Sequence, residues 1–137
     1  IKIWQNSGEQ GTLLHTLEQH SEPVVRVCFS RDGKDLLSAS EDGTIKLWNP
    51  TTGTCLATFD AHDGGVTRFF FLPNNPKQFI SCGLDSKVKL WDYPSFKLIR
   101  TFEGHNNGNI LGLAVSQDGQ KVATAAVDKT FRLWDIN

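Results

Sequence analysis

Tryptophans recur along this chain at a nearly constant interval. They stand 44, 43 and 43 residues apart, at Trp4, Trp48, Trp91 and Trp134. An interval of about 40–45 residues is typical of repeat architectures in which each unit is one small sheet. Since a single unit of this kind cannot bury its apolar face alone, neighbouring units must pack against each other. The chain is therefore predicted to contain about three repeats that share their cores.

Other residue types keep fixed positions relative to these tryptophans. An aspartate lies six residues before each of the last three tryptophans, and a serine or threonine lies four residues before each aspartate. A histidine precedes the same tryptophans by 28 or 29 residues. The residues of these sets are His20, Ser38, Asp42, Trp48, His62, Ser81, Asp85, Trp91, His105, Thr124, Asp128 and Trp134.

The segments between these positions are short, apolar and rich in β-branched and aromatic residues. They are separated by turn dipeptides such as Asp32-Gly33, Asp63-Gly64 and Asp118-Gly119. This pattern is typical of strands joined by tight turns. No segment keeps the apolar spacing of three and four residues that indicates a helix. An all-β fold of antiparallel strands is predicted.

The segment from Leu37 to Trp48 resembles the WD40 repeat family, and so do the corresponding segments of the later repeats, 81–91 and 124–134. The resemblance implies a partial β-propeller built of antiparallel four-stranded blades. The implied parts are a partial blade over 1–17, blades over 24–59 and 66–102, and three strands of a last blade over 109–134. Because propellers usually need about four to eight blades, this chain, 1–137, is expected not to close a ring by itself. It is expected to be part of one larger propeller, packing against the remaining blades of a parent protein or against other copies.

The resemblance also implies a role for the recurring His, Ser or Thr, Asp and Trp, which in this family form a structural hydrogen-bond network within each repeat. Ser38, His20 and Asp42 are also the residue types of a catalytic triad, which leaves a hydrolase as a third hypothesis. The same set recurs in each repeat, whereas an enzyme of this class needs one activated serine beside an oxyanion hole. No catalytic residue is therefore predicted.

In the WD40 family, two positions per repeat ring the mouth of the central channel. The corresponding residues here are Val25, Glu41, Thr67, Leu84, Leu111 and Val127. An apolar rim with one acid favours a protein or peptide partner that carries an apolar anchor and a cation. The leading hypothesis is a non-catalytic protein–protein interaction scaffold within a larger WD40 protein. A substrate-recruiting subunit of a ubiquitin ligase remains an alternative, since it would use the same rim.

Charge and composition argue against several other classes of protein. The formal net charge is -1, with 14 basic and 15 acidic residues, so nucleic acid is not an expected partner. No apolar stretch is long enough for a membrane span. The three cysteines form no CxxC pair, which favours a reducing intracellular compartment, cytoplasmic or nuclear, and no metal site. No phosphate-binding loop is present in the sequence, so no cofactor is expected.

Overall fold

The computed structural model describes residues 1–6, 8, 10–106 and 108–137. Within these residues the regular structure consists of antiparallel strands, as predicted. A two-stranded sheet contains β1 (Lys2–Asn6) and β2 (Gly11–Thr16). A four-stranded sheet contains β3 (Val24–Phe29), β4 (Leu36–Ser40), β5 (Thr44–Asn49) and β6 (Thr54–Asp60). A second contains β7 (Val66–Phe71), β8 (Gln78–Gly83), β9 (Lys87–Asp92) and β10 (Leu98–Glu103). The last sheet contains β11 (Ile110–Val115), β12 (Lys121–Ala126) and β13 (Phe131–Asp135).

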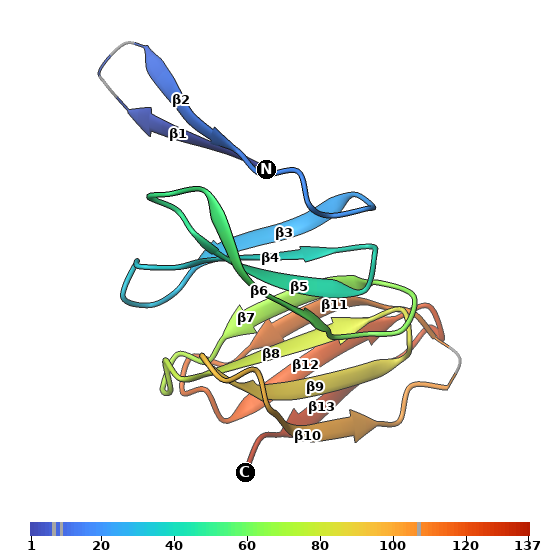
Figure 1. Cartoon of the computed structure of the whole chain (residues 1–137). Coiled ribbons are helices and arrows are strands. Elements are labelled where there is room, and N and C mark those ends of the chain that lie inside the picture. Colours follow the sequence, from blue (N-terminus) through green and yellow to red (C-terminus); the bar gives the residue numbers. More distant parts are fainter. Residues whose placement is uncertain (7, 9, 107) are drawn as a thin grey trace.

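The sheets follow one another in chain order and leave the ring open, as expected for part of a propeller (Figure 1). The first strand of each larger sheet lies nearest to its neighbours, and β7 contacts both β3 and β11. The inner strands β3, β7 and β11 therefore lie next to one another and join three repeats.

The cores lie between neighbouring sheets, because successive side chains of a strand point to opposite faces. On β8, Phe79 packs into the core shared with the sheet β3–β6, together with Leu37 and Ile45. The next residue, Ile80, packs into the core shared with β11–β13, together with Val122. Each central sheet thus uses both faces, which is why one repeat does not bury its apolar residues alone.

The last sheet keeps one apolar face uncovered by the described residues. Phe131 and Leu133 of β13 are 74% and 64% exposed. Neighbouring exposed apolar side chains of this size usually mark an interface. The face agrees with the expectation that further blades, or another copy of the chain, pack against it.

The connections between strands alternate between two ends of the sheets, because paired strands run in opposite directions. One end, called here the rim end, carries the segments 41–43, 61–65, 84–86 and 127–130. The other, called the opposite end, carries 30–35, 72–77, 93–97 and 116–120. In Figure 1 the β4–β5 connection of the rim end lies at the right and the β3–β4 connection at the left.

Candidate functional site

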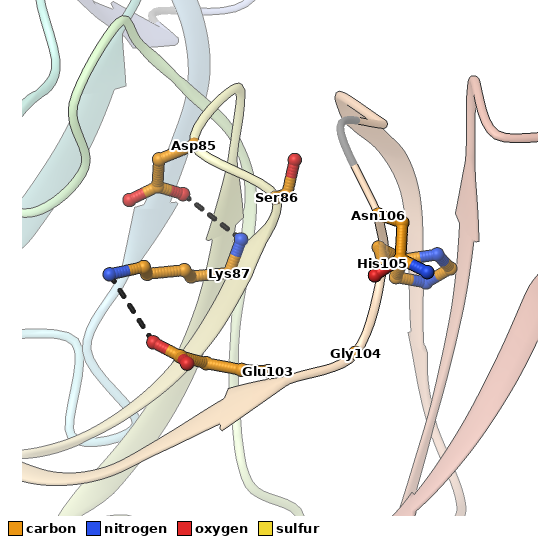
Figure 2. Close-up of a pocket in the computed structure, with 7 residues that line it drawn as sticks. All are labelled: Asp85, Ser86, Lys87, Glu103, Gly104, His105 and Asn106. Carbon is orange, nitrogen blue, oxygen red and sulfur yellow. Dashed lines mark hydrogen bonds and ion pairs between the residues drawn. The ribbon is translucent and has the colours of Figure 1, made fainter.

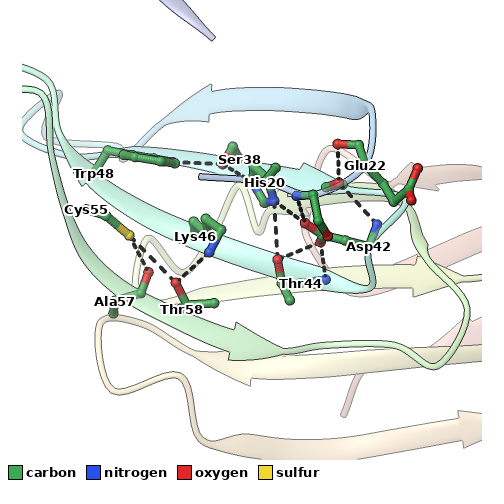
Figure 3. Close-up of polar contacts among 12 residues, drawn as sticks. His20, Glu22, Ser38, Asp42, Thr44, Lys46, Trp48, Cys55, Ala57 and Thr58 are labelled. Carbon is green, nitrogen blue, oxygen red and sulfur yellow. Dashed lines mark hydrogen bonds and ion pairs between the residues drawn. The ribbon is translucent and has the colours of Figure 1, made fainter. Parts of the chain in front are cut away.

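A chain of side-chain hydrogen bonds links the four recurring residues of the first full repeat (Figure 3). His20 Nδ1 lies 2.8 Å from Asp42 Oδ2, and His20 Nε2 lies 2.7 Å from Ser38 Oγ. The Trp48 indole donates to the same Ser38 oxygen at 2.8 Å. A neutral imidazole that carries its proton on Nδ1 donates to the carboxylate and accepts from the hydroxyl. Every polar atom of this chain of bonds therefore has a partner.

The other two repeats contain the same arrangement. In both, the histidine Nδ1 lies 2.8 Å from the aspartate, and the tryptophan indole donates to the hydroxyl at 2.8 Å. The residues that the structure brings together in this way are His62, Ser81, Asp85 and Trp91 in one repeat, and His105, Thr124, Asp128 and Trp134 in the next.

The geometry around the serines opposes the hydrolase hypothesis. Ser38 and Ser81 are 0% exposed. Each hydroxyl donates to a histidine, and each oxygen already accepts a hydrogen bond from an indole. A nucleophile must be reachable by the substrate and free to attack it. These hydroxyls are buried and each already makes two hydrogen bonds, so they are suited to holding strands together and not to attacking a substrate.

Sequence reasoning missed two threonines that complete the networks. The Thr44 hydroxyl donates to Asp42 Oδ1 at 2.6 Å, and the Thr130 hydroxyl donates to Asp128 Oδ1 at 2.7 Å. Burial by itself raises the pKa of Asp42, but the hydrogen bonds from Thr44 and His20 outweigh it and hold that pKa at about 2. The signal in the sequence is a threonine two residues after the aspartate, which Lys87 replaces in the middle repeat.

These shifts predict how stability depends on pH. Burial lowers the pKa of His62 below its ordinary 6.5, so the unfolded chain takes up a proton there first. The buried neutral His62 therefore contributes to the free energy of unfolding above about pH 6.5, and this contribution is lost as the pH falls. The lowered pKa of Asp42 adds stability that is present above about pH 4 and is lost towards pH 2. Urea unfolding of the full-length protein across this range should show midpoints that fall in both windows.

The variant Asp42→Asn provides the control for the acid window, because an amide does not titrate there. Its urea midpoint should fall less between about pH 4 and pH 2, where the lowered pKa values of Asp85 and Asp128 still contribute, while keeping the fall below about pH 6.5. A midpoint that stays constant from about pH 7.5 to pH 5 would contradict a buried neutral His62.

Three of the predicted rim residues share one structural position, at a strand irregularity. The pairing register shifts between Val24 and Arg26 on β3, and at the equivalent places on β7 and β11. A bulge leaves one residue out of the ladder and turns its side chain in a new direction. The residues left out are Val25, Thr67 and Leu111.

A cavity of about 320 Å³ lies at the rim end, where the three inner strands meet. It is lined by Val25, Glu41, Val66, Thr67, Arg68, Leu84 and Leu111. Five of the six predicted rim residues are therefore brought together, whereas Val127 is exposed outside this cavity.

Some polar side chains of this rim cavity already have hydrogen-bond partners within the protein, and one does not. The Thr67 hydroxyl oxygen lies 2.5 Å from the Ile110 carbonyl oxygen and 3.1 Å from that of Cys82, so its single hydrogen is donated chiefly to Ile110 and ties β7 to β11. Arg68, which sequence reasoning missed, donates to the Thr67 carbonyl oxygen at 2.7 Å. The Glu41 carboxylate has no hydrogen bond or ion pair within the described residues, and Glu41 is exposed. The cavity therefore offers apolar walls, the free carboxylate of Glu41 and the exposed Arg68 guanidinium, which has no acidic partner within the described residues.

A second hollow, of about 560 Å³, lies between the sheets β7–β10 and β11–β13 and is polar (Figure 2). Its charged groups already have partners. Lys87 Nζ lies 3.3 Å from Glu103, and Asp85 accepts hydrogen bonds from the Lys87 amide and from His62. Because these charges are matched internally, the rim cavity is the better candidate for a binding site.

In the described part of the chain, no three His, Cys, Asp or Glu side chains gather as a metal-ligand set, and no helix is long and apolar enough to cross a bilayer. The three thiols are free, and burial raises the pKa of Cys82 to about 11, which makes that thiol unreactive.

Comparison with known families agrees with this geometry. The family model described as "WD domain, G-beta repeat" matches residues 11–49, 53–92 and 96–135. The chain belongs to the WD40 family. Each WD40 match starts on the outer strand of one sheet and ends on the third strand of the next, as in β2 to β5. Consecutive repeats therefore interlock, since every full sheet takes its fourth strand from the following repeat.

Two curated proteins illustrate what the chain resembles. It is 34% identical over 73 residues, 53% of this chain, to the periodic tryptophan protein 2 homolog of Dictyostelium discoideum, of which the match covers 8%. It is 41% identical over 59 residues, 43% of this chain, to the human pre-mRNA-processing factor 17, of which the match covers 10%. The matches thus span a tenth or less of the length of these relatives.

Proposed function

We propose that this chain is a non-catalytic protein-binding platform within a longer WD40 protein, and that its ligand is seated at the rim cavity. In this proposal 1–17 is a partial blade, 24–59 and 66–102 are blades, and 109–134 gives three strands of a last blade. The His, Ser or Thr, Asp and Trp networks hold the blades rigid. The observation that carries the proposal is the meeting of Val25, Leu84 and Leu111 beside the free Glu41 carboxylate.

The chemistry of the rim cavity favours a peptide or loop with one apolar side chain and one cation. A volume of about 320 Å³ is within the usual range of small ligand sites, large enough for one anchoring side chain. Anchors buried in such pockets supply most of the binding energy of protein interfaces. The free acid at the edge of the cavity would pair with a lysine or arginine of the partner and fix its orientation.

The relatives support an intracellular, nuclear setting for this platform. The human relative is named as a factor that processes pre-mRNA, which in human cells takes place in the nucleus. Three free cysteines agree with a reducing compartment. The ligand itself is proposed to be a protein, because the net charge of -1 does not favour phosphate contacts.

Peptides selected from a random displayed library against the full-length protein should share an apolar residue next to a lysine or arginine. Leu111→Asp should weaken their binding by about tenfold or more, measured by fluorescence anisotropy, because a charge then faces the anchor. The matched control is Leu56→Asp on the outer strand β6, since Leu111 and Leu56 are 52% and 53% exposed.

Selected peptides that bind Leu111→Asp and the unchanged protein equally would refute the rim proposal. If a rim peptide also acts as a degradation signal when fused to a reporter protein in cells, the ubiquitin-ligase alternative is favoured over the general scaffold. Hydrolysis of a peptide or ester by the purified protein, lost in Ser81→Ala, would contradict both.

A further inference from the structure

A third hollow lies between the inner strands β3 and β7, towards the opposite end of the sheets. It has a volume of about 230 Å³ and is called here the arginine hollow. Its lining comprises Arg26, Cys28, Phe29, Arg31, Phe70 and Phe71. None of these residues lines the rim cavity. The arginine hollow is thus a separate surface, formed by two neighbouring repeats.

Aromatic rings of the next sheet hold the Arg26 side chain in place. Its guanidinium carbon lies 4.0 Å from the centroid of the Phe70 ring and 5.9 Å from that of Phe69. A guanidinium over a ring is attracted to the face of that ring, while the N–H groups at the edge of its own plane stay available for hydrogen bonds. A cation held in this way loses little conformational freedom when it binds a ligand.

The Arg26 cation has no counter-charge in the part of the protein that the structure describes. Arg26 is half-buried, and its Nε is buried without a hydrogen-bond partner. Its guanidinium makes no ion pair with any described residue, although it lies between two sheets. A charge that has lost part of its hydration is stabilised by a charge of opposite sign. Arg26 is therefore suited to bind an anion from outside the chain.

Arg31 adds a second cation to the arginine hollow. It is exposed and makes no ion pair within the described residues. No carboxylate lines the arginine hollow, since Asp32 and Asp35 line the neighbouring hollow, which Arg31 also borders. Burial raises the pKa of the Cys28 thiol, and the charged groups that act on that pKa are Arg26 and Arg31, which both lower it. The arginine hollow therefore has an excess of positive charge.

We propose that the arginine hollow binds the phosphate group of a small phosphate monoester, between Arg26 and Arg31. A phosphate monoester carries a charge of about -1.5 to -2 near neutral pH, which matches two guanidinium groups. A carboxylate or a phosphodiester carries only one negative charge and would leave one cation unmatched. Guanidinium groups also bind phosphate oxygens through paired hydrogen bonds.

The size and the walls of the arginine hollow favour a small ester with an apolar body. A volume of about 230 Å³ lies below the usual range of drug-sized ligand sites, so the ligand is a small molecule. Phe29 is 55% exposed and offers an aromatic surface beside the two cations. The net charge of -1 belongs to the whole chain and does not oppose a local site made by two arginines. This inference does not rest on the rim proposal.

The test uses the full-length protein and phenyl phosphate, a small monoester with an aromatic body. Its Kd is measured by ligand-observed NMR at constant ionic strength. Phenyl phosphate should bind more tightly than benzoate and than the diester methyl phenyl phosphate, since each of these carries a single charge. Arg26→Gln and Arg31→Gln should each weaken phenyl phosphate by about tenfold, because each removes one charged pair of hydrogen bonds.

Arg100→Gln is the matched control. The Arg100 guanidinium also lies over a ring, 4.6 Å from the Phe102 centroid, but on the outer strand β10. This variant should leave phenyl phosphate binding unchanged. Because Arg31 is exposed, Arg31→Gln keeps the test decisive even where Arg26→Gln lowers the stability of the fold. Absence of phenyl phosphate binding, equal binding of the three ligands, or binding that Arg31→Gln leaves unaltered would overturn the proposal.

Discussion

Replacing Phe79 by alanine should lower the free energy of unfolding by about 3–5 kcal/mol. Phe79 lies on β8 and is 0% exposed, so the removed ring leaves a cavity inside the shared core. Its ring contacts several others at centroid distances of 5.9 to 6.2 Å. Those rings belong to Phe59, Phe69, Phe71, Trp91 and Phe96. The loss would loosen the contact between two sheets, and urea unfolding of the full-length protein measures it.

Two further variants separate this cavity effect from a general loss of apolar side chains. Phe79→Leu keeps most of the buried volume and should cost clearly less than the alanine variant. Leu56→Ala removes an exposed side chain on the outer strand β6 and should change the unfolding free energy little. Equal losses for Phe79→Ala and Leu56→Ala would show that Phe79 is not a central core residue.

Replacing Asp85 by alanine should also destabilise the protein by about 3–5 kcal/mol, because it leaves several buried donors without an acceptor. Asp85 accepts from His62 Nδ1 at 2.8 Å and from the Lys87 amide at 3.1 Å. Lys89 Nζ lies 3.6 Å away and loses its counter-charge as well. A loss of this size approaches half the stability of an ordinary domain. The measurement is again the urea midpoint in the full-length protein.

The neighbouring positions give the controls for Asp85. Asp85→Asn keeps an acceptor oxygen and should be milder than alanine, while Asp63→Ala removes an exposed carboxylate and should be nearly neutral. Leu84→Asp, one residue before the network, should leave folding nearly intact and weaken binding at the rim. If Leu84→Asp and Asp85→Ala destabilised the fold equally, the division between network and rim would fail.

The short apolar segments and their turn dipeptides were enough to predict the all-β fold. The tryptophan interval and the segments that resemble the WD40 family predicted the repeats. Both patterns are local properties of each repeat. The members of each network were named from the family resemblance, and their contacts lie inside one repeat. His15 was a different case, since it stands outside the repeated pattern. Its Nε2 lies 2.8 Å from the Thr51 carbonyl oxygen, a contact that links the β1–β2 hairpin to the β5–β6 turn.

The family resemblance named five residues of the rim cavity, but their grouping into one cavity was decided by the tertiary structure. The bulges that turn Val25 and Leu111 towards the rim cavity are changes of pairing register, which residue identities at those positions do not specify. The hydrogen bond from the Tyr93 hydroxyl to Asp35 likewise joins two sheets and residues 58 positions apart. A repeat pattern fixes what each unit looks like. Where two units touch depends on how whole sheets pack, so surfaces shared between repeats emerge only when the chain is folded.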